Sequence, residues 1–233
     1  MRTKLTLIVS VLVLALVLSA CGPAASGETR SLSVTGSGMV SLTPDIAYIY
    51  IGVHTENRDI AQALAENNLQ AQAVADALKN AGVAAEDIQT SSFSVWSMED
   101  YDEVGQAYTK YTVDNSVYVT VRDLSNLGAL LNTVVGSGAN TINSIQFDVA
   151  DKTAALTEAR QKAMENAAAL AGELAQVAGL SLGEIQTITY TDSMPYPYYG
   201  MGGGGASAPN ASVPIQPGQL QISVTVNVTY AVR

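Results

Sequence analysis

Apolar and polar residues alternate along several segments of the chain, and this period of two is typical of strands with one buried face. The alternation is clearest at the two ends of the folded part, in residues 31–42 and 220–230. Residues 46–53 are apolar at both parities, which predicts a more deeply buried strand. Four further segments are predicted to be strands: 87–98, 111–123, 140–149 and 184–191.

Three other segments carry apolar residues at helical spacing. Asn57 or Asp59 can cap the first helix, Asp123 opens the second, and Asp151 caps the third. Each of these helices should end at a glycine: the first at Gly82, the second at Gly136 and Gly138, and the third at Gly179. The apolar stripes predicted to face a core are Ile60, Leu64, Ala71, Val74 and Leu78 in the first helix, Leu124, Leu127, Leu131 and Val134 in the second, and Leu156, Ala159, Ala163, Ala167, Leu170, Leu174 and Val177 in the third.

The resulting order is β-β-α-β-β-α-β-α-β-β, with strands that come largely as hairpins. This order predicts an α+β fold in which helices pack on a mostly antiparallel sheet. Two strands that each follow a helix ending in Gly hint at two small α/β units. Gly36 and Gly38 share one parity of the first strand, which indicates either a bulge or close packing. The small alanines of the third helix permit close approach to a sheet or to another helix.

The first 20 residues differ from the rest. Arg2 and Lys4 precede an apolar run from Leu5 to Leu18, and small residues follow, which is the order of a secretory signal. The run is short for a membrane span. The segment Leu18-Ser19-Ala20-Cys21 resembles the lipobox of bacterial lipoproteins, in which the cysteine is acylated and becomes the first residue of the mature chain. Alternatives are an ordinary signal with an incidental cysteine and an uncleaved anchor helix.

This reading divides the chain into a signal peptide (1–20), a short tether (21–30) and one α+β domain (31–233). It predicts a protein outside the cytoplasm that is attached to the cell membrane through lipid on Cys21. Two or three acyl chains anchor a protein far more firmly than one. Because the chain has a single cysteine, acylation of that residue leaves no thiol for disulfide or redox chemistry.

Charge excludes two kinds of partner. The formal net charge of −10 argues against nucleic acid, whose phosphates need Lys and Arg, and against electrostatic docking on anionic lipid. Residues 192–218 are rich in Gly and Pro and are predicted to form a long mobile loop. Its tyrosines are either part of an unstructured segment or an exposed interaction site, and the candidate residues are Tyr196, Tyr198 and Tyr199.

Residues able to carry catalysis are scarce. His54 is the only histidine and is interpreted as a hydrogen-bonded residue at a strand end. Gly36-Ser37-Gly38 lacks the third glycine and the following helix of a dinucleotide site. The acidic cluster Glu99, Asp100, Asp102 and Glu103 fits either a calcium site or, more simply, a solvated hairpin tip. We therefore expect no catalytic residues, no bound metal and no cofactor, and we expect that the protein is not an enzyme.

Several collinear stretches resemble the SIMPL-domain family. The residues that carry the resemblance are Gly36, Gly38, Pro44, Asp45 and Ala47, then Gly82, Val83, Asp87, Ile88, Gln89 and Thr90, then Ala159, Arg160, Ala163, Gly179, Leu182 and Gly183, and finally Pro214, Ile215, Pro217 and Gly218. Ser144 stands where the family often has Gly, and Leu170 stands where many members carry Lys. Gly36, Pro44 and Asp45 are interpreted as turn residues that define the fold.

The resemblance implies an extracytoplasmic protein without known catalytic residues. It is a family of periplasmic immunogenic and oxidative-stress-associated proteins, in which some members form large homo-oligomers and others are linked to oxidative or DNA-damage stress. The leading hypothesis is thus a lipid-anchored structural or interaction module of the cell envelope that self-assembles. The alternative is a protein that binds a ligand or wall polymer through the 192–218 loop.

Overall fold

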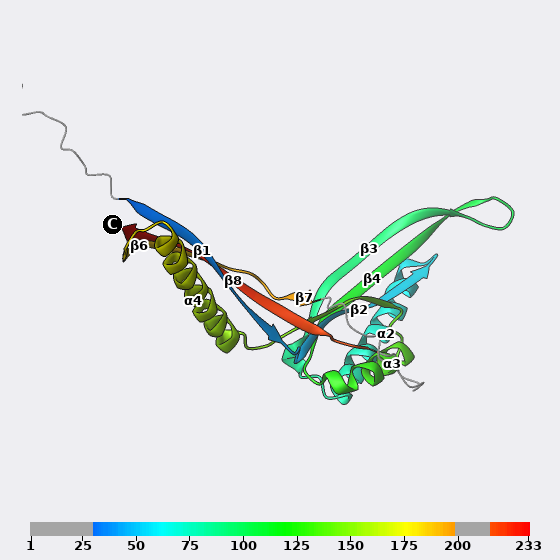
Figure 1. Ribbon diagram of the computed structural model, residues 1–233. Coiled ribbons are helices and arrows are strands. Elements are labelled where there is room, and N and C mark those ends of the chain that lie inside the picture. Colours follow the sequence, from blue (N-terminus) through cyan, green and yellow to red (C-terminus); the bar gives the residue numbers. More distant parts are fainter. Residues whose placement is uncertain (1–29, 199–214) are drawn as a thin grey trace, which may run out of the picture.

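The structure is a computed structural model that describes residues 30–198 and 215–233 (Figure 1). The predicted signal sequence, Cys21, Tyr199 and most of the 192–218 loop lie outside the described residues. The predicted α+β class is confirmed, and the element order follows the predicted one with a short added strand, β7 (Tyr196–Tyr198).

The strands form two antiparallel four-stranded sheets. The first, here called the terminal sheet, has the order β1-β8-β6, and β7 also pairs with β8. The second, the central sheet, has the order β3-β4-β2-β5. The strand bounds are β1 Ser31–Leu42, β2 Ile46–Asn57, β3 Ile88–Tyr101, β4 Ala107–Val121, β5 Thr141–Asp148, β6 Leu182–Asp192 and β8 Gln219–Val232.

Each sheet has helices on one face. The helices α2 (Ile60–Asn80) and α3 (Leu127–Gly136) cover the central sheet, and α4 (Thr153–Val177) covers the terminal sheet. Short 3₁₀ turns, Ala85–Asp87 and Leu124–Asn126, precede β3 and α3. Figure 1 shows the two sheets as limbs that diverge from a common junction, with the β3–β4 hairpin extending furthest.

Asp59 and Asp123 begin helical segments as predicted, since Asp123 caps the 3₁₀ turn that leads into α3. The N-cap of α4 is Lys152 and not the predicted Asp151, which lies one residue earlier. Asp59 accepts hydrogen bonds from the backbone N–H groups of Ala61 and Gln62 and so caps α2. Asp151 accepts from the N–H of Thr153, the first residue of α4. Gly82, Gly138 and Gly179 have positive φ angles just after the helices, where glycine costs least.

The core beneath α4 contains an alanine at every fourth residue of that helix. All six are buried, and the first five pack in one cluster with Val224, Val226 and Val228 of β8: Ala155, Ala159, Ala163, Ala167, Ala171 and Ala175. The predicted stripe was correct for the alanines but wrong for its last two members, since Leu174 and Val177 are exposed. Because the small residues let the helix approach closely, the larger ones are turned to its flanks.

Gly36 and Gly38 are what allows this close approach. A Cβ atom on Gly36 would lie 2.2 Å from the Ala163 carbonyl oxygen, and one on Gly38 would lie 2.0 Å from the Ala159 carbonyl oxygen. Neither residue has a positive φ, and β1 pairs with β8 without a bulge. The expectation of close packing is therefore confirmed, and the interpretation of Gly36 as a turn residue is wrong.

Asp45 joins the two segments that cross between the sheets. Its N–H donates to the Asp148 carbonyl oxygen at 3.1 Å, and its carboxylate accepts from the Ala150 N–H at 2.8 Å. One crossing leads from β1 to β2, and the other leads from β5 to α4. Asp45 is therefore a residue that defines the fold, as the sequence indicated.

Ser144 is the one described non-glycine residue with a positive φ, at 55°. It lies in β5 where the register with β2 shifts between Ile49 and Tyr50. A bulge residue in this conformation favours glycine. The positive φ angle of this residue therefore explains why the family often has Gly where this chain has Ser144.

Candidate functional site

A network of polar side chains occupies the face of the central sheet that the helices leave open. His54 on β2 and Asp114 on β4 are direct cross-strand neighbours, and His54 Nδ1 lies 2.6 Å from Asp114 Oδ1. The indole N–H of Trp96, on β3, donates to Asp114 Oδ2 at 3.2 Å. His54 lies within β2 rather than at its end, because the strand continues to Asn57.

The network continues toward the hairpin tip. His54 Nε2 is 3.3 Å from Glu56, and Lys110 forms ion pairs with Glu56 at 2.9 Å and with Asp100 at 3.2 Å. The hydroxyl of Tyr108 donates to Asp100 at 3.1 Å. The charged groups are thus paired with one another along the sheet face. This arrangement satisfies His54, as expected, and supports a structural role for it.

The pairing shifts the ionisation of the central two groups. The hydrogen bond with Asp114 is the largest effect on His54 and raises the pKa of its imidazole, against a smaller opposing effect of burial. Partial burial disfavours the charged form of Asp114, but the hydrogen bonds from His54 and Trp96 outweigh it and lower the pKa of that carboxyl.

The His54–Asp114 pair should make stability depend on pH in a defined window. A raised pKa in the folded state means that the His54 contribution is complete below pH 6.5 and is lost as pH rises through the folded value. The lowered pKa of Asp114 means that its contribution is present above pH 3.8 and is lost as pH falls below it. Because the pair is partly exposed, we expect less than about 1 kcal/mol between these limits.

NMR titration can test this pair directly, because the chain has a single histidine. We expect an imidazole pKa above 6.5 in the wild type and a fall toward that value in Asp114→Asn. Asp123→Asn, a change at an exposed helix start, is the matched control and should leave the pKa unchanged. An equal pKa in wild type and Asp114→Asn would contradict the assignment.

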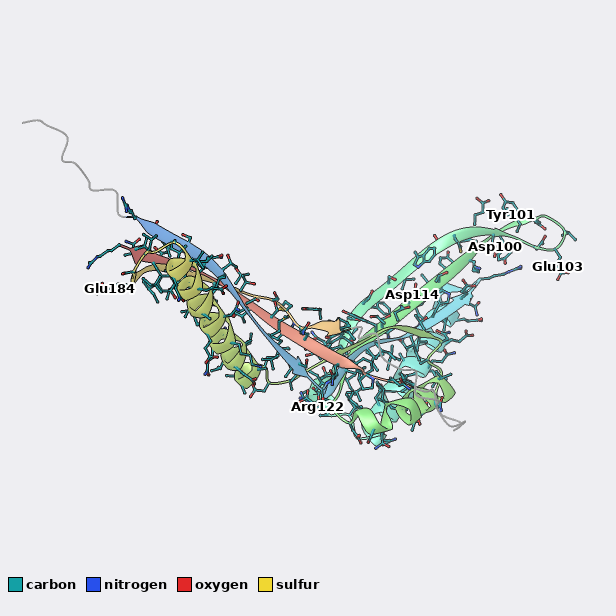
Figure 2. All side chains as sticks on the ribbon, in the orientation of Figure 1. Asp100, Tyr101, Glu103, Asp114, Arg122 and Glu184 are labelled. Carbon is teal, nitrogen blue, oxygen red and sulfur yellow. The ribbon has the colours of Figure 1, made fainter. Side chains whose placement is uncertain are left out.

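The acidic cluster at the hairpin tip is built as a turn. Figure 2 shows Asp100, Tyr101 and Glu103 at the end of the β3–β4 hairpin, with Asp114 further along it. The Asp102 carboxylate accepts from the N–H groups of Val104 and Gln106, which fixes the turn. Among residues 30–198 and 215–233, no group of three or more His, Cys, Asp or Glu side chains could hold a metal ion.

The candidate interaction residues divide between described and undescribed parts. Tyr196 and Tyr198 belong to β7, which pairs with Gln221 and Gln219 of β8. The prediction of a continuous mobile loop over 192–218 is therefore wrong at this point, because backbone pairing with β8 orders the segment. Tyr196 also donates its hydroxyl proton to Gln221 Oε1 at 2.8 Å.

Strand β6 presents an apolar surface that sequence reasoning missed. Its residues facing the α4 side are opposite buried residues of β8, yet they are exposed: Leu182 38%, Ile185 45%, Ile188 49% and Tyr190 61%. The helix packs over β1 and β8 and leaves this face of β6 uncovered. We call these four residues the β6 apolar face. Only Ile188 and Tyr190 alternate with polar residues, and two register shifts bring Leu182 and Ile185 to the same face, which a sequence pattern cannot show.

The helix α4 reaches the end of this face through one charged side chain. The Arg160 guanidinium forms an ion pair with Asp192 and lies 5.6 Å from the ring centre of Tyr190. This contact holds Tyr190 at the boundary of the helix and the open surface. Across the described part of the chain, none of the helices is long and apolar enough to cross a membrane.

These features define an α+β protein of two helix-backed antiparallel sheets, with a network of paired ionisable side chains on the open face of the central sheet. The chain belongs to the SIMPL family, a family described as proteins of unknown function (DUF541), whose model matches residues 32–230.

Individual relatives are similar over most of their length. The 26 kDa periplasmic immunogenic protein of Brucella melitensis biotype 1 is 32% identical over 88% of this chain and 86% of its own. The protein of the same name from Brucella abortus strain S19 is 32% identical over the same shares. The uncharacterized protein YggE of Escherichia coli K12 is 27% identical over 84% of this chain and 80% of its own.

Proposed function

We propose that this protein is a non-catalytic component of the bacterial cell envelope, anchored by lipid on Cys21, that self-assembles through the β6 apolar face. Two kinds of observation support a location outside the cytoplasm. The first 20 residues have the order of a secretory signal, and relatives of similar length are named periplasmic proteins. The family resemblance also suggests a role in oxidative or DNA-damage stress.

The observation that carries the proposal is the uncovered β6 apolar face. Large side chains exposed together on one surface are uncommon on monomers and mark interaction sites. Ile188 and Tyr190 lie opposite Val228 and Val226, so the apolar surface is continuous with the core beneath α4. A second copy that covered this face would complete a layer that α4 leaves incomplete.

The open edge of β6 supports the same surface. In the order β1-β8-β6, one edge of β6 has no partner strand among the described residues. Unpaired strand edges readily pair with another chain unless charge or a covering element prevents it. An edge beside an apolar face offers both backbone hydrogen bonds and side-chain burial to an incoming copy.

Replacing Ile188 with glutamate tests the assembly. We expect the full-length wild type, purified in mild detergent, to sediment as an oligomer of defined size. In Ile188→Glu the added carboxylate would have to be buried unpaired in the interface, so association should weaken at least tenfold. Sedimentation velocity over a range of protein concentrations measures this change.

Thr189→Glu is the matched control, because it places the same charge on the opposite face of the same strand. It should leave the oligomer intact, and both variants should keep the wild-type circular dichroism spectrum. A wild type that is monomeric at every concentration, or an Ile188→Glu variant that sediments as the wild type does, would overturn the proposal.

A further inference from the structure

The face of the terminal sheet opposite α4 is covered with neutral polar side chains. The strand registers place them in cross-strand rows, such as Ser33–Thr229–Thr187 and Thr35–Asn227–Thr189. We call this surface the hydroxyl face, and its residues are Ser33, Thr35, Ser37, Met39 and Ser41 of β1, Gln221, Ser223, Thr225, Asn227 and Thr229 of β8, and Thr187, Thr189 and Thr191 of β6.

The side chains of the hydroxyl face are ordered and accessible. The alternate residues of β8, such as Val226 and Val228, are buried beneath α4, which turns the polar set outward. Ser33 and Thr229 share a hydrogen bond of 2.9 Å, and Thr35 donates to Asn227 at 2.8 Å. These cross-strand bonds fix side-chain positions before any ligand arrives, which lowers the entropy cost of binding.

The chemistry of this face excludes several classes of partner. None of its residues is ionisable, so it offers no ion pair to a charged polymer. The net charge of −10 on the whole chain disfavours anionic polymers further. Cores of protein–protein interfaces are enriched in aromatic, Met and Arg side chains and depleted in Ser, whereas Ser and Thr dominate here. A neutral partner that is itself rich in hydroxyl groups fits better.

An aromatic ring lies at one end of the hydroxyl face. Tyr196 of β7 is paired with Gln221, and its hydroxyl donates to the Gln221 side chain at 2.8 Å. Tyr196 is still 42% exposed, and Met39 on β1 is 52% exposed. An anchored, exposed ring can stack on the apolar C–H face of a sugar ring, while the hydroxyls beside it bond the sugar's edges.

We propose that the hydroxyl face and Tyr196 bind a neutral glycan strand. Each Ser or Thr hydroxyl both donates and accepts, and so does each sugar hydroxyl, so the two arrays match in any local orientation. Neighbouring strands present these groups about 4.8 Å apart and residues i and i+2 about 6.7 Å apart, a regular array suited to a repeating polymer. The inference rests on the proposed extracytoplasmic location but not on self-assembly, which uses the opposite face of β6.

Titration of the full-length protein in mild detergent with defined oligosaccharides tests the proposal. The probe is a neutral hexamer of β-1,4-linked N-acetylglucosamine, compared with the cationic de-N-acetylated hexamer and with heparin as an anionic polymer. We expect the neutral hexamer to bind at micromolar to millimolar concentration by calorimetry and heparin not to bind. The triple variant Thr35→Val, Thr189→Val and Thr225→Val should weaken binding at least tenfold, because valine keeps the shape and removes the hydroxyl.

Two variants of Tyr196 separate the contribution of its aromatic ring from that of its hydroxyl group, and a third variant is the control. Tyr196→Phe keeps the ring and should retain most of the affinity, whereas Tyr196→Ala should lose it severalfold. The double variant Thr90→Val and Thr109→Val makes the same exchange at exposed positions of the central sheet and should bind as the wild type does.

Three results would overturn the assignment. They are no binding of the neutral hexamer at millimolar concentration, equal binding by the triple variant, or preference for the cationic hexamer. The last result would indicate the carboxylates of the central sheet instead. Sedimentation velocity on the same samples distinguishes loss of glycan binding from loss of self-assembly. The valine variants leave the β6 apolar face unchanged, so they should sediment as the wild type does.

Discussion

Replacing Gly38 with alanine is expected to destabilise the protein by about 3 kcal/mol, the upper range for overpacking a core. The added Cβ would lie 2.0 Å from the Ala159 carbonyl oxygen and 2.6 Å from the Ala163 backbone nitrogen. Both atoms belong to the main chain of α4, so no side-chain rotation can relieve the overlap. The helix must move away from β1, which opens the core that the alanine stripe fills. Thermal denaturation should show a melting temperature lower by roughly 10 °C.

The same exchange elsewhere in this packing unit should have the opposite sign. Gly172 lies within α4, and a Cβ atom there would meet nothing within 4 Å. Gly172→Ala removes backbone freedom from the unfolded chain and should stabilise the protein by up to about 1 kcal/mol. If Gly38→Ala melts at the wild-type temperature or above it, the close approach of β1 and α4 is not what stabilises this sheet.

The glycine and alanine spacing was readable from sequence because each pattern has its own period. Gly36 and Gly38 fall on one parity of a strand, and Ala159, Ala163 and Ala167 fall four apart on a helix. The two patterns describe complementary surfaces, and the structure packs them together. The fold class and the capping roles of Asp59 and Asp123 were predictable for the same reason, since they depend on local chemistry.

Pairings distant in sequence were not predictable in this way. The terminal sheet forms because β1 pairs with β8, near the other end of the chain, and alternation alone does not name a partner. Phe93 and Trp96 are large side chains of the edge strand β3, yet both are exposed, and Trp96 lies on the open face of the sheet beside Asp114. A period of two shows that a strand has two different faces but not what covers each of them.

Buried polar groups were a second source of error. Asn67 lies in the buried stripe of α2, where only apolar residues were expected, while Ile60 of the predicted stripe is exposed. The Asn67 side-chain amide donates to the carbonyl oxygens of Val53 and Val113, at 2.9 and 3.1 Å, and so ties α2 to two strands. Such a role depends on strand carbonyls far along the chain, which no local pattern reports.

The arrangement of surfaces gives the terminal sheet two separate uses. One face of β6 is apolar and open at the side of α4, and the other face belongs to the hydroxyl face. In the sequence, the predicted lipid attachment at Cys21 precedes β1, the first strand of this sheet, which begins at Ser31. The tests with Ile188→Glu and with the valine variants address the two faces independently.

Replacing Cys21 with serine is expected to abolish lipid attachment entirely. Cys21 is the only cysteine and follows the apolar run at the position of the lipobox residue, and serine cannot form the thioether that holds the lipid. Each buried CH₂ group contributes about 0.8 kcal/mol to membrane binding, and stable anchoring takes at least two chains, so loss of the lipid removes the whole anchor.

To test this, a bacterium that makes the full-length protein is grown with an alkyne fatty acid. The protein is then coupled to a fluorescent dye through the alkyne, and its N-terminal peptide is identified by mass spectrometry. The wild type should carry the label on a peptide that begins at Cys21, and Cys21→Ser should show none. Ser26→Ala, a change within the tether, should be labelled as the wild type is. An unlabelled wild type would disprove the lipid anchor: a peptide cut elsewhere would indicate an ordinary signal, and an intact N-terminus would indicate an uncleaved anchor helix.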